Sequence, residues 1–159
     1  MPDRNKPLED YTKEELLEAL NSKKELDSYF LLNLVYEENR KNDKYYPYFD
    51  DFLQMIYGRT SFTRMRGFGL CVSLAKWDTE NRIDRHLQEM LILLEDEKPT
   101  TVRIVLSSLR DLLECKPYLA EVIRDNLSRI DCSKYKDSMA PLVRKDAEKL
   151  MTRIEDILN

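Results

Sequence analysis

Hydrophobic residues recur every three to four positions along most of this chain, the spacing that gathers them on one face of an α-helix. No window alternates apolar and polar residues for long, so β-strands are not expected. Thr12 and Ser22 each stand three residues before a glutamate and form capping-box patterns, and Pro99 suits a first helical turn. The predicted helices span residues 12–20, 22–40, 47–57, 61–76, 80–95, 99–115, 117–130 and 138–158.

One helical pattern occurs three times and indicates a repeat. Each copy has apolar or small residues at relative positions 0, 4, 7 and 11, with arginine directly after the first. The copies are Thr63, Gly67, Leu70 and Leu74; Val102, Leu106, Leu109 and Leu113; and Val143, Ala147, Leu150 and Ile154. Shifts of about 39 and 41 residues superpose them, and a period near forty is typical of stacked two-helix units.

The repeat predicts the architecture. Each pattern would lie on the second helix of a pair, which gives units near residues 46–76, 80–115 and 117–157. The two N-terminal helices would form a looser fourth pair. Because one pair leaves an apolar face exposed, stacking buries it. We therefore expect an all-α fold, a right-handed α-α superhelix of three to four helix pairs and roughly eight helices.

The run from Pro99 to Leu109 resembles the second helix of a HEAT repeat. Asp96 and Asp137 each lie seven residues before a repeat arginine, at the place of the family's acidic turn. The resemblance implies that these carboxylates pair with Arg103 and Arg144. It covers about residues 46–157, and the first unit departs from the pattern, with Tyr57 in the acidic position. The family consists mostly of scaffolds and of adaptors that bind proteins or peptides, and this is the function the resemblance implies.

Length and composition favour a single domain. With 159 residues, 42% hydrophobic and 35% charged, the chain can bury a substantial core. We expect a flexible segment at 1–11 and one HEAT-like α-solenoid domain at 12–159. The formal net charge of −4 disfavours nucleic acid and anionic membrane as partners.

The expected location is cytoplasmic. The chain has three cysteines, an odd number, and they are widely spaced, which suits a reducing compartment better than a disulfide framework. The first nine residues lack the apolar run of a signal peptide. The longest apolar stretches, 30–36 and 90–94, are far shorter than the roughly 20 residues of a membrane span.

Arginines and aromatic residues supply the candidate binding groups. Arg64, Arg103 and Arg144 repeat together, either as a ladder for anionic ligands or as structural links, and the resemblance favours the structural reading. Arg103, Ser107 and Arg110 lie on one helix face. Twelve of the fifteen aromatic residues lie within 29–77. Among them Phe30, Phe49 and Phe52 are expected in the core, and Tyr45, Tyr46, Tyr48 and Tyr57 are candidates for an interaction surface.

Catalytic and metal-site patterns are missing from the sequence. His86 is the only histidine, no cysteine or serine near it suggests a nucleophile pair, and no spacing fits a metal site. We therefore expect a non-enzymatic scaffold or adaptor that binds a protein or peptide without a cofactor. Its candidate contact residues are Tyr46, Tyr57, Arg66, Arg103, Ser107 and Arg110.

Two other functions compete with this one. Some HEAT-like proteins resemble alkyl-base DNA glycosylases, which use tryptophan and aspartate on a basic concave face, and Trp77-Asp78 superficially fits that chemistry. The negative net charge and the single tryptophan argue against it. Self-association through the end helices is the other alternative, so the expected oligomeric state is a monomer or a weak homodimer.

Overall fold

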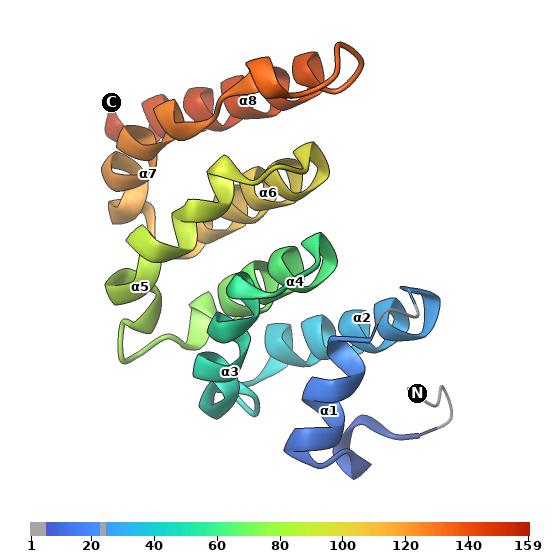
Figure 1. The fold of residues 1–159 in the computed structure, drawn as a ribbon. Helices are drawn as coiled ribbons and strands as arrows, with labels where there is room; N and C mark the ends of the chain where they lie inside the picture. Colours follow the sequence, from blue (N-terminus) through green and yellow to red (C-terminus); the bar gives the residue numbers. More distant parts are fainter. Residues whose placement is uncertain (1–5, 23–24) are drawn as a thin grey trace. The chain divides into compact units, whose positions relative to one another are not determined.

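The computed structural model describes residues 6–22 and 25–159, and this part of the chain is mostly helical, with no strand (Figure 1). It contains eight α-helices, so the predicted all-α class and helix count are confirmed. The helices are α1 (Lys13–Leu20), α2 (Glu25–Lys41), α3 (Phe49–Gln54), α4 (Ser61–Ser73), α5 (Arg82–Met90), α6 (Pro99–Cys115), α7 (Ala120–Asn126) and α8 (Ala140–Leu158). Short 3-10 helices extend several of them, among them η3 (Met55–Tyr57), η5 (Leu91–Glu95) and η6 (Pro117–Leu119).

Local signals set several helix boundaries. The Thr12 hydroxyl accepts from the backbone N–H of Glu15 at 3.1 Å, and the Glu15 carboxylate accepts from the backbone N–H of Thr12 at 3.1 Å. This is the predicted capping box of α1. The box predicted at Ser22 includes residues outside the described part of the chain. Pro99 occupies the first turn of α6, which ends at Cys115 as expected.

The chain forms two compact units, residues 1–77 and 78–159. Unit 1 contains α1 to α4 and unit 2 contains α5 to α8, so each unit holds two helix pairs. One continuous domain over 12–159 stays a prediction. In the N-terminal segment expected to be flexible, residues 8–10 form the 3-10 helix η1 (Leu8–Asp10), and Lys6 pairs with Glu15 at 2.7 Å. Residues 1–5 lie outside the described part.

In unit 1, α4 packs against α3 and η3 and also against α2. Phe49, Phe52 and Phe68 are completely buried between these elements. Phe30, which we expected in the core, is 39% exposed, so that prediction is wrong. On α2, Leu31, Leu32 and Val35 form the buried face of the helix, and Phe30 lies outside this face.

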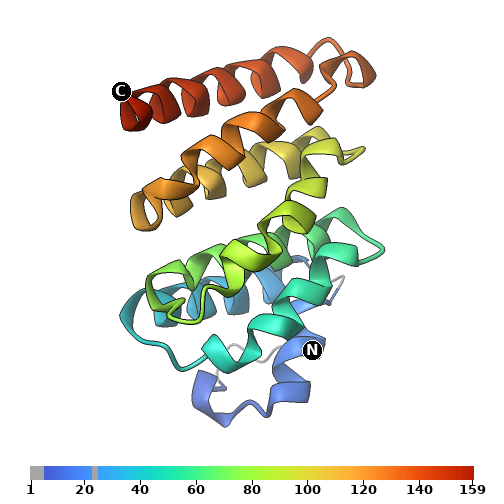
Figure 2. The same cartoon turned by 90° about the vertical axis from the view of Figure 1, so that its left-hand side faces the viewer.

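In unit 2, α6 and α8 lie side by side (Figures 1 and 2). η5, which continues α5, packs against α6, and α7 packs against α8. The aligned leucines Leu109 and Leu150 are buried here, as Leu70 is in unit 1. Each lies on the second helix of its pair, the place that the repeat predicts for it. The aligned leucines of the repeat are therefore buried in both units.

Candidate functional site

The six predicted contact residues are divided between the two units. Tyr46, Tyr57 and Arg66 belong to unit 1, and Arg103, Ser107 and Arg110 belong to unit 2. Each group is described within its own unit.

Arg66 is a buried structural cation in unit 1. Its side chain donates from Nη1 to the carbonyl oxygen of Leu20 at 3.0 Å and to the hydroxyl of Ser28 at 2.9 Å. Its guanidinium also lies 5.7 Å from the ring centroid of Phe62. These contacts tie α4 to the end of α1 and to α2. At 5% exposure, Arg66 does not present its charge at the surface.

Of the four tyrosines predicted for an interaction surface, two are core and Tyr48 is half-buried. Tyr45 and Tyr46 are buried, and the Tyr45 ring lies 5.4 Å from that of Tyr48. Burial, with the nearby Glu38 carboxylate, raises the pKa of Tyr45 to about 12 because a phenolate would be poorly solvated there. Tyr57 is the exception at 54% exposed.

In unit 2, the outward side of α6 forms a continuous surface. Thr100, Ile104, Ser107, Asp111 and Glu114 recur every three to four residues and are all exposed. Ile104 is 44% exposed, a large apolar side chain among polar ones. We call these five residues, with Arg103 and Arg110 at their edge, the α6 outer face.

Arg103 and Arg110 differ in their contacts. Arg103 is half-buried and donates from Nε to Asp146 of α8 at 2.6 Å. Its partner is therefore a carboxylate of the neighbouring second helix and not the expected Asp96. The Asp96 side chain instead accepts from the backbone N–H of Lys98 at 3.0 Å. Arg110 is exposed, two turns further along α6.

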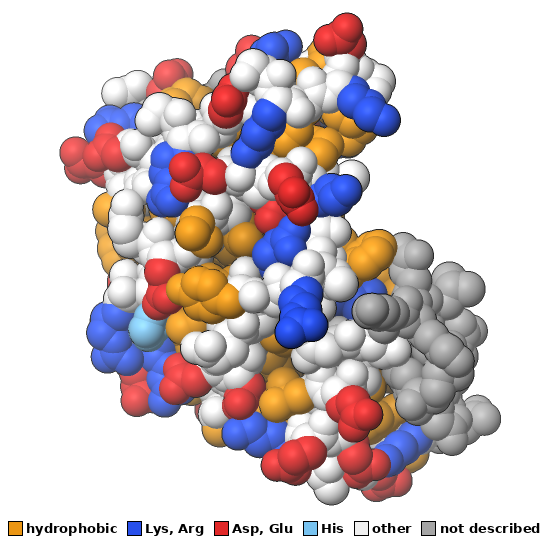
Figure 3. Space-filling view, viewed as in Figure 1, with side chains coloured by type: hydrophobic (Ala, Val, Ile, Leu, Met, Phe, Trp, Pro, Cys, Tyr) orange, Lys and Arg blue, Asp and Glu red, His pale blue; other side chains and the backbone are white. Residues whose placement is uncertain are grey.

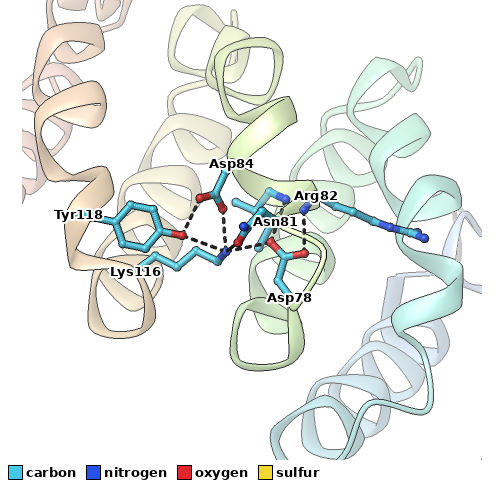
Figure 4. A network of polar contacts seen from close by, with 7 residues as sticks. Asp78, Asn81, Arg82, Asp84, Lys116 and Tyr118 are labelled. Atoms are coloured by element: carbon cyan, nitrogen blue, oxygen red, sulfur yellow. Dashed lines mark hydrogen bonds and ion pairs between the residues drawn. The ribbon is translucent and has the colours of Figure 1, made fainter.

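A polar network in unit 2, with Lys116 and Asp78 buried at its centre, was not predicted as a site (Figure 4). Lys116, in the turn between α6 and η6, is 5% exposed. Its ammonium group lies 2.6 Å from Asp84 Oδ1 and 3.0 Å from Asp78 Oδ2. It also reaches the Asn81 side-chain oxygen and the Tyr118 hydroxyl, both at 3.2 Å.

The two carboxylates of this network are fully engaged. Asp78 also accepts from the backbone N–H groups of Arg82 at 2.8 Å and Ile83 at 2.9 Å, which caps the start of α5. The second oxygen of Asp84 accepts from the Tyr118 hydroxyl at 2.5 Å. Asn81, directly before α5, has φ 54°, a left-handed conformation that asparagine tolerates better than most residues.

Electrostatics hold Lys116 in its charged form. Burial lowers the pKa of Lys116, but hydrogen bonds to Asp84, Asp78 and Tyr118 outweigh it, so the pKa lies above the ordinary lysine value. The hydrogen bond to the Asp84 carboxylate raises the pKa of the Tyr118 hydroxyl. With these bonds directed inward, the network fastens the start of α5 to the turn before α7.

Within residues 6–22 and 25–159, no three His, Cys, Asp or Glu side chains lie together as metal ligands would. His86 contacts Glu89 one turn later on the same helix. Among the same residues, no helix combines the length and the apolar character that crossing a membrane requires. On the face displayed in Figure 3, Lys and Arg side chains over α5–α8 alternate with Asp and Glu, with small hydrophobic groups between them.

Comparison with known proteins returns no match to a family model, a curated protein or a solved structure.

Proposed function

We propose that the protein is a non-enzymatic module that binds a protein or peptide partner through the α6 outer face. The exposed side of α6 carries the proposal. The helix has 17 residues and its inward side is core, so it is held rigidly. Its outward side offers Ile104 as an apolar contact and Arg110 as a cation, and arginine is enriched at protein interfaces.

The helix pairs support an assignment to the HEAT-like solenoids, with successive pairs stacked in a right-handed superhelix. In such an arrangement the second helices line an extended concave surface, to which each repeat adds contact area. α6 and α8 are the second helices of unit 2, and the Arg103–Asp146 ion pair joins their exposed edges. The α6 outer face then belongs to the concave, partner-binding side.

A photo-crosslinking amino acid at Ser107 tests this function. Irradiation in an extract of the source cells should produce discrete protein adducts from Ser107, because this side chain lies at the centre of the exposed face. The matched control carries the same amino acid at Glu121, which is exposed on α7. Adducts of equal identity and yield from both positions, or nucleic acid in place of protein, would contradict the proposal.

Arg110→Glu should lower recovery of the crosslinked partner about tenfold, because it reverses a charge on the binding face. The exposed position predicts unchanged helicity in far-ultraviolet circular dichroism. Recovery equal to that of the unmodified protein would place the contact elsewhere.

Tyr57→Ala tests whether unit 1 adds a second contact. Tyr57 is the exposed member of the predicted tyrosine set. Its truncation should weaken the free energy of partner binding by about 1–2 kcal/mol, seen as lower partner recovery, while the fold persists. Tyr46→Ala is unsuitable as a partner test, because it removes a buried ring. Light scattering on the purified protein tests the prediction of a monomer or weak homodimer.

A further inference from the structure

Helix α8 carries a row of cations on one side. Lys145, Lys149 and Arg153 are spaced four residues apart and are exposed. We call these three residues the α8 basic stripe. Leu142, 38% exposed, stands three residues before the stripe, so an apolar side chain begins the same side of the helix.

The basic side chains of the α8 basic stripe lie along one edge of the helix, with Asp156 among them. At about 100° per residue, Leu142, Lys149 and Arg153 fall near Asp146, with Lys145 next to them on the solvent side. Asp146 marks the edge of α8 that meets α6, because it pairs with Arg103. Glu148 and Glu155 fall on the other exposed edge together with Arg144. The α8 basic stripe therefore adjoins the α6 outer face.

These cations lack intramolecular neutralisation, unlike Arg103. Within the described residues, Arg110 and the α8 basic stripe make no ion pair or side-chain hydrogen bond. Four positive groups thus face solvent on a surface that also carries two exposed apolar side chains, Ile104 and Leu142, and the carboxylates of Asp111, Glu114 and Asp156. A ligand that carries both negative and apolar groups would match this surface.

We propose that the partner presents an acidic segment whose carboxylates contact Arg110 and the α8 basic stripe and whose apolar side chains contact Ile104 and Leu142. This inference rests on the proposed function. Arginine donates two parallel hydrogen bonds to a carboxylate, and exposed pairs contribute modestly, so several must act with apolar burial. A phosphate backbone fits less well, because its evenly spaced charges cannot avoid Asp111, Glu114 and Asp156, whereas a protein segment can place uncharged side chains beside these carboxylates.

A defined probe tests the chemistry of the partner. The protein should raise the fluorescence anisotropy of a fluorescein-labelled peptide of repeated Glu-Leu-Glu-Glu by binding it. Added NaCl should weaken this binding. The same peptide with glutamine in place of glutamate should bind at least about tenfold more weakly. A single-stranded DNA of about 20 nucleotides serves as the competing class of ligand.

Variants locate the site. Lys149→Glu should reduce affinity for the acidic peptide about tenfold. The matched control, Arg144→Glu, makes the same charge change on the opposite edge and should alter affinity less than about twofold. Equal losses in both variants, equal binding of the glutamine peptide, or tighter binding of DNA would overturn the inference.

The two proposals fail separately. If Ser107 crosslinks a protein while the acidic peptide does not bind, the acidic chemistry is wrong and the binding module stands. If Ser107 yields no protein adduct, the function itself is wrong.

Discussion

Gly67→Ala is expected to lower the free energy of unfolding of unit 1 by about 3 kcal/mol. Gly67 lies where α4 crosses α3 and η3, and its missing side chain permits the close approach. An added Cβ would lie 2.6 Å from the Cβ of Met55, 2.7 Å from the carbonyl oxygen of Phe52 and 3.0 Å from the backbone nitrogen of Ile56. Backbone atoms cannot move aside alone, so the helices must separate.

The better helix propensity of alanine offsets about 1 kcal/mol of this cost. Urea titration followed by Trp77 fluorescence measures the effect, because the only tryptophan belongs to unit 1 and donates to the Asn39 carbonyl oxygen at 2.6 Å. An unchanged midpoint would show that α4 does not approach α3 as closely as described.

Gly69→Ala is the matched control on the same helix. Its added Cβ would meet mainly the hydroxyl oxygen of Tyr36, the far end of a side chain that can rotate. The loss should therefore be smaller, about 1 kcal/mol. Combining Gly69→Ala with Tyr36→Phe removes that oxygen and should recover much of the loss. The same Tyr36→Phe change should not relieve Gly67→Ala, because the Cβ added at Gly67 meets Met55 and backbone atoms.

The regular helices could be predicted because their signals are local. Pro99 fixed the start of α6, and the capping box at Thr12 fixed the start of α1. The leucines of the repeat identified the inward side of α6 and α8. Helix periodicity, caps and proline positions act within a few residues, so the sequence alone displays them.

The misplaced residues depend on tertiary packing. Arg66 reads as a surface cation in the sequence, yet Leu20 and Ser28 supply oxygen acceptors from distant positions. The repeat arginine Arg103 pairs with Asp146, 43 residues later, whereas the resemblance to a HEAT repeat implied Asp96. Such partners follow from which helices meet, and a single sequence does not specify that register.

The Lys116 network shows the same limit most clearly. Lys116 precedes Pro117 in a connection between helices, where a lysine is ordinarily solvated. Its acceptors lie more than 30 residues earlier, at Asp84 and Asp78. Only stacking of α5 beside the turn before α7 gathers these charges and makes the lysine structural.

Lys116→Met preserves the bulk of the side chain but leaves the buried Asp78 and the partly exposed Asp84 without their cation, so it should destabilise unit 2 by about 3–5 kcal/mol. Asp78 suffers most, since its side chain is fully buried. Urea titration followed by far-ultraviolet circular dichroism measures the loss. The contribution of Lys116 should be fully present below pH 10.5, the ordinary lysine pKa, and lost as the pH rises through the raised pKa of the folded state. The difference in the free energy of unfolding between Lys116→Met and the unmodified protein should shrink only in that alkaline range.

Arg124→Met provides the matched control in the same unit. Arg124 pairs with Asp125 at 3.1 Å and Glu121 at 3.6 Å on the exposed side of α7, so its removal should cost less than about 1 kcal/mol. Adding Asp84→Asn to Lys116→Met removes one uncompensated charge and should restore part of the lost stability. Equal losses for Lys116→Met and Arg124→Met would mean that water reaches the network, because only solvation by water would make a buried lysine as dispensable as an exposed arginine.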